Sequence, residues 1–193
     1  PPTVSLLLAG TALSSLLSSM VSFIMAMRDD DLHQVFFWLL GGFGGSNWDH
    51  LISILPYVIP GAAILFLLSR PLDVLAFGED SAKTMGVSIN LTRLLTVGAA
   101  SLTTAAAVAV SGIIGFVGLL APHAARLIFG PSHRALMPAS ALIGAILLVL
   151  ADIFARTVLA PVELPVGILT SMLGAPFFLF LLRTRREGLG GGA

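Results

Sequence analysis

The chain has 193 residues, of which 56% are hydrophobic and only 10% are charged, and its mean hydropathy is +1.00. A soluble domain carries about 25% charged residues, so this composition excludes an ordinary soluble enzyme, and it is too apolar for a disordered chain. Ten basic and ten acidic residues leave no net charge that would indicate nucleic-acid binding. There is no cysteine and the four histidines lack metal-ligand spacing, so neither disulfides nor a metal site are expected. We therefore expect an all-α protein embedded in a membrane.

Charged residues divide the chain into apolar segments long enough to cross a bilayer, which takes about 20 residues per helix. The first segment ends just before the acidic stretch 29–31. The second contains Pro56 and Pro60, which membrane helices tolerate and which predict a kink. The candidate spans are residues 4–27, 51–69, 94–122, 136–150 and 166–182.

The segment 94–122 decides the topology, because 29 residues are long for one helix and short for two. A break at Ser111–Gly112 would place eight of the ten basic residues on one side of the membrane and only Arg28 and Arg156 on the other. A single helix would give a division of four to six. Because basic residues accumulate on the cytoplasmic side, we predict a polytopic bundle of about six transmembrane helices, with both ends of the chain in the cytoplasm.

The cytoplasmic loop 70–93, between the second and third spans, is longer than the 2–8 residues that usually join two helices. We expect one short helix over 72–76, then a second that is capped by Asp80 or Ser81 and closed by Gly86. Two such helices form either a docking surface for a partner protein or an amphipathic connector on the membrane surface. Physical chemistry alone leaves both interpretations open.

Five motifs follow one another along the chain. The most specific is Leu-Ala-Phe-Gly-Glu-Asp-Ser-Ala-Lys-Thr-Met-Gly-Val at 75–87. The others are Leu-Leu-Leu-Ala-Gly at 6–10, Trp-Leu-Leu-Gly-Gly-Phe-Gly-Gly-Ser-Asn-Trp at 38–48, Gly-Phe-Val-Gly-Leu-Leu-Ala-Pro-His-Ala-Ala-Arg at 115–126, and Ala-Asp-Ile-Phe-Ala-Arg at 151–156 with the Pro- and Gly-containing stretches 163–167 and 174–177. Together they closely resemble permease subunits of the FecCD type, which belong to binding-protein-dependent ABC importers of iron-siderophores, haem and cobalamin.

This resemblance covers essentially the whole chain and implies a fold. The family permease is a type II importer subunit with ten membrane helices, and the chain resembles its helices 5–10. Residues 1–187 would then be a partial transmembrane permease domain that lacks the first four helices, and 188–193 a flexible Gly-rich tail. A truncated gene, a split subunit and a trimmed chain all fit the sequence, and such a fragment is not expected to transport alone.

The resemblance also implies an ATPase-coupling role for the cytoplasmic loop. In the family, its two short helices sit in a cleft of an ABC ATPase subunit and carry nucleotide-driven motion into the membrane helices. Glu79 would either cap a helix or contact a basic residue of the ATPase. The residues that carry over are Leu75, Gly78, Glu79, Asp80, Ser81, Ala82, Lys83 and Gly86.

At the outer side, the resemblance assigns Arg156 to contact an acidic residue of a periplasmic or lipoprotein substrate-binding protein. A guanidinium pairs with a carboxylate in a fixed two-pronged geometry, and Asp152 is spaced to hold it through an i,i+4 pair. The alternative is an arginine that extends its charged group to the membrane interface and has no partner.

His123 lies towards the cytoplasmic end of its span, and it is expected to be a buried neutral side chain.

Pathway residues are expected in two places. Thr3 matches a hydroxyl-bearing gate position of the family, although the neighbouring gate position is Val4 here. Gly41, Gly42 and Phe43 belong to a glycine-rich segment that we expect near the outer mouth of the pathway, with simple packing as the alternative.

We therefore expect the permease subunit of an ABC importer in the cell inner membrane, carrying an iron(III)-siderophore or otherwise haem or cobalamin. It would be no enzyme and would bind no cofactor, because ATP is hydrolysed by the partner ATPase. The second permease copy would make a homodimer, or a paralogue a heterodimer, surrounded by membrane lipids. An ion-coupled secondary transporter is the alternative of another class, but the first three spans lack the mid-membrane ionisable groups that ion coupling uses. A rhomboid-like protease would need a catalytic serine motif that is not evident.

Overall fold

The computed structural model describes the backbone of residues 2–27, 32–158, 160 and 163–190, and their side chains except at 2, 3, 6, 32–34 and 180–190. The chain divides into two compact units, Pro1–Leu39 and Leu40–Ala193. The first contains α1 (Pro2–Ala26) and most of α2 (Leu32–Leu40). The second contains α3 (Trp48–Leu67), α4 (Ser69–Ala76), α5 (Glu79–Thr84), α6 (Ile89–Ser111), α7 (Val117–Phe129), α8 (His133–Thr157) and α9 (Val166–Gly190).

The long apolar helices agree with the expected spans. Within the described residues, four helices are long and apolar enough to cross a membrane, at 7–26, 48–67, 89–111 and 133–157. Two more apolar helical stretches are α7, at 117–129, and the part of α9 whose side chains are described, at 166–179. The expected all-α bundle of six apolar segments is therefore confirmed.

The break at Ser111–Gly112 is also confirmed, because α6 ends at Ser111 and Gly112 has a positive φ of 69°. The next helix begins only at Val117, so residues 112–116 form a non-helical connection where the sequence suggested an immediate second helix. Phe116 has a φ of 65°, the only positive φ of a non-glycine residue in the described part of the chain. Such a conformation costs about 1–3 kcal/mol and is held by the surrounding packing.

Two elements differ from expectation. The helix α2 was not predicted, because its nine residues are too few for a span and the charge pattern locates only spans. At the other end, α9 continues to Gly190, three residues into the segment 188–193 that we expected to be a flexible tail. No proline interrupts that stretch, so the helix can extend through it; residues 191–193 lie outside the described part.

In the first unit, two hydroxyl groups of α1 form hydrogen bonds within the helix. The Thr11 hydroxyl donates to the Leu8 carbonyl at 2.9 Å, and the Ser19 hydroxyl donates to the Ser15 carbonyl at 2.9 Å. Because lipid offers no hydrogen-bond partners, a helix that crosses it must bind such hydroxyls internally. The hydroxyls of α1 are therefore compatible with a lipid-facing span.

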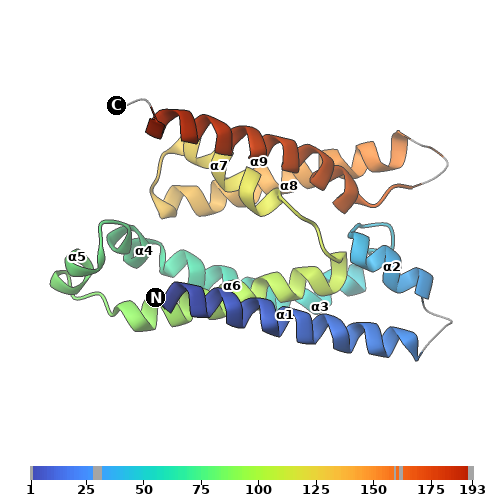
Figure 1. The fold of residues 1–193 in the computed structure, drawn as a ribbon, viewed down its shortest axis with the longest axis horizontal. Coiled ribbons are helices and arrows are strands. Elements are labelled where there is room, and N and C mark those ends of the chain that lie inside the picture. Colours follow the sequence, from blue (N-terminus) through green and yellow to red (C-terminus); the bar gives the residue numbers. More distant parts are fainter. Residues whose placement is uncertain (1, 28–31, 159, 161–162, 191–193) are drawn as a thin grey trace. The chain divides into compact units, whose positions relative to one another are not determined.

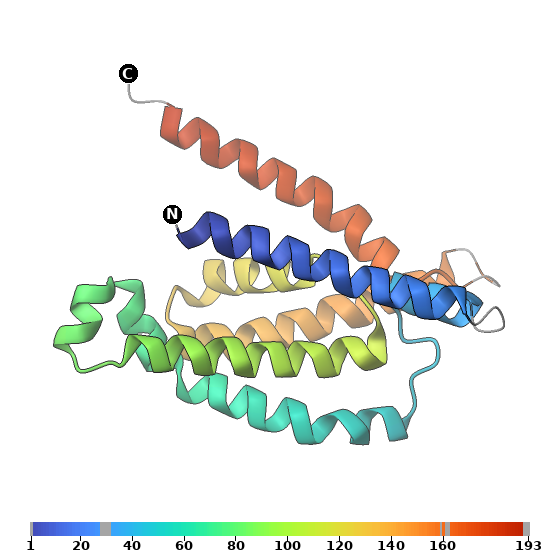
Figure 2. The same cartoon turned by 60° about the horizontal axis from the view of Figure 1, so that its bottom comes forward.

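In the second unit, α3 and α6 run side by side (Figures 1 and 2). The side chain of Asn47 caps α3 by accepting from the His50 amide at 2.9 Å, and the helix continues through both of its prolines. Gly61 is buried where the helices touch, and a Cβ there would overlap with the Thr103 hydroxyl of α6. This close approach needs a glycine, as is common where membrane helices pack.

The helices α7, α8 and α9 form a second packed group (Figure 1). Small residues line the face that α8 buries, and a Cβ added at Gly144 would lie 3.6 Å from side-chain carbons of Ala121 and Val117 of α7. Near one end of α8, Ala125 packs with Leu136 and Ala139; near the other, Ala151 and Ala155 pack with Val166 of α9. The core of the unit is thus built mainly from alanine and glycine contacts.

Candidate functional site

The loop between α3 and α6 contains the two short helices that the sequence predicts. They lie together at one end of the α3–α6 pair, the same end at which α7 connects to α8 (Figure 1). The first helix, α4, begins at Ser69, earlier than the expected 72, and follows α3 almost directly. Arg93, expected within the loop, belongs to α6.

The start of α5 corrects the predicted cap. Gly78 occupies the N-cap position with a φ of 114°, where we expected Asp80 or Ser81. Glu79 and Asp80 instead form the first turn, where a carboxylate interacts favourably with the helix dipole. Gly86 closes the helix as expected, with a φ of 75° and its amide bonded to the Lys83 carbonyl at 3.1 Å.

Burial separates the loop residues into two groups. Ala82 is completely buried, Leu75 is partly buried, and the other predicted coupling residues are exposed. Two apolar side chains that were not singled out in the sequence are strongly exposed in the loop: Phe77 is 83% and Met85 68% accessible. The sequence contained a signal for this exposure. Phe77 and Met85 each stand directly before a glycine in a polar loop, where a large apolar side chain has no evident packing role.

Glu79 has a partner within the chain. Its carboxylate lies 2.5 Å from Arg93 of α6, with both side chains about half exposed. This pair joins α5 to α6, and the two expected roles of Glu79, a helix cap and a contact with a basic residue of the ATPase, stay predictions. Asp80 and Lys83 lie 4.0 Å apart on the exposed side of α5.

Asp73 of α4 makes contacts that the sequence did not predict. Its carboxylate accepts from the backbone amide of His133 at 2.8 Å and from the Ser132 hydroxyl at 3.2 Å, and lies 2.6 Å from Nδ1 of His133. The amide hydrogen bond from His133 lowers the pKa of Asp73, although partial burial opposes that shift. The contacts span about 60 residues of sequence, and no local pattern marks such a pair.

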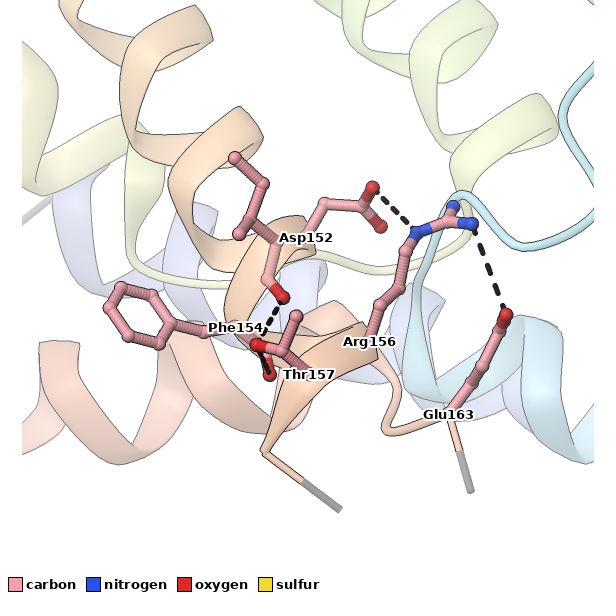
Figure 3. A network of polar contacts seen from close by, with 6 residues as sticks. Asp152, Phe154, Arg156, Thr157 and Glu163 are labelled. Atoms are coloured by element: carbon pink, nitrogen blue, oxygen red, sulfur yellow. Dashed lines mark hydrogen bonds and ion pairs between the residues drawn. The ribbon is translucent and has the colours of Figure 1, made fainter. Parts of the chain in front are cut away.

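At the opposite end of α8, Arg156 lies between two carboxylates (Figure 3). Its Nε donates to Asp152 at 2.9 Å, which is the predicted i,i+4 pair, and its Nη1 lies 3.9 Å from Glu163. Glu163 was not expected to take part. The Arg156 side chain is 42% exposed, so it remains accessible while it is paired.

The glycine-rich segment is packed against three other elements. Gly42 donates to the Ser111 carbonyl at 2.8 Å, and Gly41 accepts from the amide of Gly167 at 3.0 Å. A Cβ at Gly41, whose φ is 68°, would overlap with the Ile113 carbonyl. Phe43 packs against the cluster of Ala151, Ala155 and Val166. These contacts favour the packing interpretation of the segment. The segment also lies beside Glu163, the second partner of Arg156, because a Cβ at Gly44 would be 3.2 Å from the Glu163 carboxylate.

The remaining candidates carry less information. Thr3 lies in α1, but its side chain is outside the described residues, so its gate role stays a prediction. His123 is partly buried, with its ring edge-on to Phe177 at 6.2 Å between centroids. Among the described residues, no three histidines or carboxylates are placed to hold a metal ion.

Comparisons with known proteins agree with the motifs. The chain matches the FecCD transport family over residues 2–184. It is 46% identical over 184 residues to the cobalamin import system permease protein BtuC of Halobacterium salinarum, covering 95% of this chain and 49% of that protein. It is 42% identical over 184 residues to the Fe(3+)-citrate import system permease protein YfmD of Bacillus subtilis, covering 95% of this chain and 55% of that protein.

The chain is also similar to a solved structure titled "An inward-facing conformation of a putative metal-chelate type ABC transporter". Its TM-score is 0.83 at 36% identity, and the match covers 92% of this chain and 58% of that chain. The chain thus spans about half the length of the curated relatives that it matches. With the family match over nearly all of its residues, the chain is a multi-pass membrane protein that belongs to the FecCD transport family, as its motifs predict.

Proposed function

We propose that the chain is part of the permease subunit of a binding-protein-dependent ABC importer for a metal chelate, in the cell inner membrane. The observation that carries this proposal is the pair of short helices α4 and α5, which lies outside the apolar spans and exposes Phe77 and Met85. Two large apolar side chains beside charged ones fit a docking surface for a partner protein, whereas an amphipathic connector would place them in the membrane surface. As a permease, the chain performs no bond chemistry and needs no cofactor of its own.

The exposed side of α5 is the proposed docking surface for the ATPase subunit. Large apolar side chains surrounded by polar ones are typical of interface anchors, and Phe77 and Met85 are flanked here by Asp80 and Lys83. Ala82 on the same short helix is completely buried and would hold α5 in place. The energy for transport would enter the permease at this surface.

The Glu79–Arg93 pair allows the docking role to be separated from an internal one. If Glu79 acts through Arg93, Glu79→Lys should reduce ATP hydrolysis stimulated by the binding protein, and the swapped pair Glu79→Lys/Arg93→Glu should restore it. If Glu79 contacts the ATPase directly, the swapped pair should stay impaired. The two results therefore distinguish an internal role of Glu79 from a direct contact with the ATPase.

We propose the outer end of α8 as the docking point for the substrate-binding protein. Arg156 is accessible and preorganised by Asp152, so its guanidinium is held where a carboxylate of a partner can reach it. Glu163 is the weaker and more exposed of its two partners, at 3.9 Å and 60% exposed. A carboxylate of the binding protein would replace Glu163 rather than Asp152.

For the substrate, we propose an iron(III)-siderophore first, with haem or cobalamin as alternatives. The names of the two relatives above refer to an iron(III) chelate and to cobalamin, and the structural relative to a metal chelate. All are large metal complexes, so they support the chelate class more strongly than any one member. The pathway would lie between two permease copies, identical or paralogous, with both ends of this chain in the cytoplasm.

Uptake into vesicles tests the function. Vesicles that contain the permease carrying this chain, its ATPase and its binding protein should accumulate a radiolabelled iron(III)-siderophore only when ATP is supplied. Cobalamin and hemin, offered separately, test the alternatives. Uptake driven by an ion gradient without nucleotide would refute the proposal in favour of a secondary transporter.

A further inference from the structure

Asp73 replaces the missing side-chain cap of α8. Ser132 occupies the N-cap position of that helix, but its hydroxyl makes no capping bond to the helix and instead donates to Asp73 at 3.2 Å. The Asp73 carboxylate in turn accepts from the amide of His133, the first residue of the helix, at 2.8 Å. The carboxylate of Asp73 on α4 therefore accepts a hydrogen bond from an amide at the N-terminus of α8, as the side chain of the N-cap residue usually does.

This contact, which we call the α4–α8 clasp, is defined by Asp73, Ser132 and His133. It is shielded better than the other ion pairs of the loop, because the Asp73 and His133 side chains are only 29% and 27% exposed. The members of the Glu79–Arg93 pair are 54% and 58% exposed, and Asp80 is fully exposed. Hydrogen bonds to a charged group at a helix N-terminus are among the stronger polar contacts, so the clasp links the loop to α8 with less screening by solvent than the Glu79–Arg93 pair has.

The helix that the clasp holds ends at the other candidate site. It runs from His133 to Thr157, about 37 Å at 1.5 Å per residue, and carries Arg156 in its last turn. Pro138 lies inside the helix, where it removes one backbone hydrogen bond. The buried face is packed on both sides of that proline, at Leu136 and from Ala139 to Ala155. This packing favours movement of the helix as one body, in which a displacement at its first residue reaches its last.

We propose that Asp73 is a positioning residue that couples the ATPase-docking loop to α8, so that movement of α4 shifts the helix that presents Arg156 to the binding protein. This inference rests on the proposed function. Such coupling is reciprocal: docking of the binding protein at Arg156 would bias the position of α4, and ATPase-driven movement of α4 would change the affinity at Arg156. The link runs through a single helix and one carboxylate.

Measuring stimulation tests the proposal. The permease carrying this chain is reconstituted with its ATPase and binding protein, and ATP hydrolysis is measured with and without the binding protein. Asp73→Asn should lower the ratio of stimulated to basal hydrolysis about fivefold or more, the lower range for coupling between sites. Asp49→Asn is the matched control, because Asp49 lies in the first turn of the long helix α3 but has no role in the clasp. It should change the ratio by less than about twofold.

A covalent link distinguishes coupling from mere support of the fold. The chain has no cysteine, so Asp73→Cys/His133→Cys can be joined by a short thiol-specific cross-linker. The unlinked variant should lose stimulation and the linked one should regain it, although neither contains the carboxylate. Stimulation that is unchanged in Asp73→Asn, or that the cross-link fails to restore, would overturn the clasp proposal. Absence of stimulation in the unmodified permease would instead refute the proposed function itself.

Discussion

A methyl group added at Gly61 tests the close contact between α3 and α6. In Gly61→Ala, the new Cβ would overlap with the Thr103 hydroxyl, and it would lie 3.2 Å from the Ala99 carbonyl. The Thr103 hydroxyl donates to the Ala99 carbonyl at 2.8 Å, so turning that side chain away breaks a hydrogen bond. The variant must therefore separate the two helices or turn the Thr103 side chain away.

The expected magnitude follows from two opposing terms. Replacing a glycine within a helix by alanine gains about 1 kcal/mol of helix propensity, whereas forcing an extra carbon into a packed contact costs about 1–3 kcal/mol. Gly98→Ala in α6 provides the first term alone, because nothing lies within 4 Å of a Cβ there. Gly61→Ala should therefore be less stable than Gly98→Ala by about 1–3 kcal/mol.

Unfolding of the protein in detergent micelles, followed by circular dichroism as a denaturing detergent is added, measures this difference. The double variant Gly61→Ala/Thr103→Ala should recover most of the loss, since it removes the overlapping hydroxyl. Equal stability of Gly61→Ala and Gly98→Ala would show that the two helices are not in the close contact described. Because the docking loop joins these two helices, the contact also fixes the distance between the ends of the loop.

Three further outcomes are expected. Gly174→Ala should destabilise the protein by about 1–3 kcal/mol, because its Cβ would overlap with the Phe116 side chain; thermal unfolding that recovers in Gly174→Ala/Phe116→Ala would support this cause. Glu163→Gln should strengthen binding of the substrate-binding protein about twofold, since exposed ion pairs such as Arg156–Glu163 are weak; calorimetry that finds weaker binding would contradict the exchange of carboxylates. The folded-state pKa of Asp73 is lowered, so its stabilising contribution is complete above the ordinary carboxyl pKa of about 3.9 and is lost as pH falls through the lower folded value. Unfolding measured from about pH 6 downwards should therefore show a steeper acid-side loss in the unmodified chain than in Asp73→Asn, and parallel curves would refute this assignment.

The positions of the spans could be predicted because they depend on the order of apolar and charged residues along the chain, not on contacts between distant residues. An apolar run of sufficient length must be a helix in lipid, and the break at Ser111 followed from the distribution of basic residues. The short helices α4 and α5 were predicted to within three residues from their glycines. Their cap was misplaced, because Gly78 adopts a φ of 114° that makes it the N-cap in place of a polar side chain.

The polar contacts of the candidate site could not be predicted in the same way. Asp73 and His133 are 60 residues apart, and nothing near either residue distinguishes it from an exposed loop residue. Arg156 was identified together with its i,i+4 partner. Glu163 lies beyond the end of α8, so its contact with Arg156 depends on the three-dimensional course of the chain and not on helix spacing. The need for glycine at Gly61 likewise depends on which helix passes it, so it is visible only once α6 is in place.

The charges at the two ends of α8 have the signs that the helix dipole favours. Asp73 is a carboxylate against the N-terminal amide, and Arg156 is a cation in the last turn. Both groups are therefore held in place by the helix itself, before any partner binds. A binding protein that docks at Arg156 has to displace only Glu163, the most distant and most exposed partner of that arginine, and an ATPase that moves α4 acts on a carboxylate already bonded to the helix. On this view the two docking sites are assembled in the free permease, and the energy of partner binding is available to shift α8 rather than to build the sites.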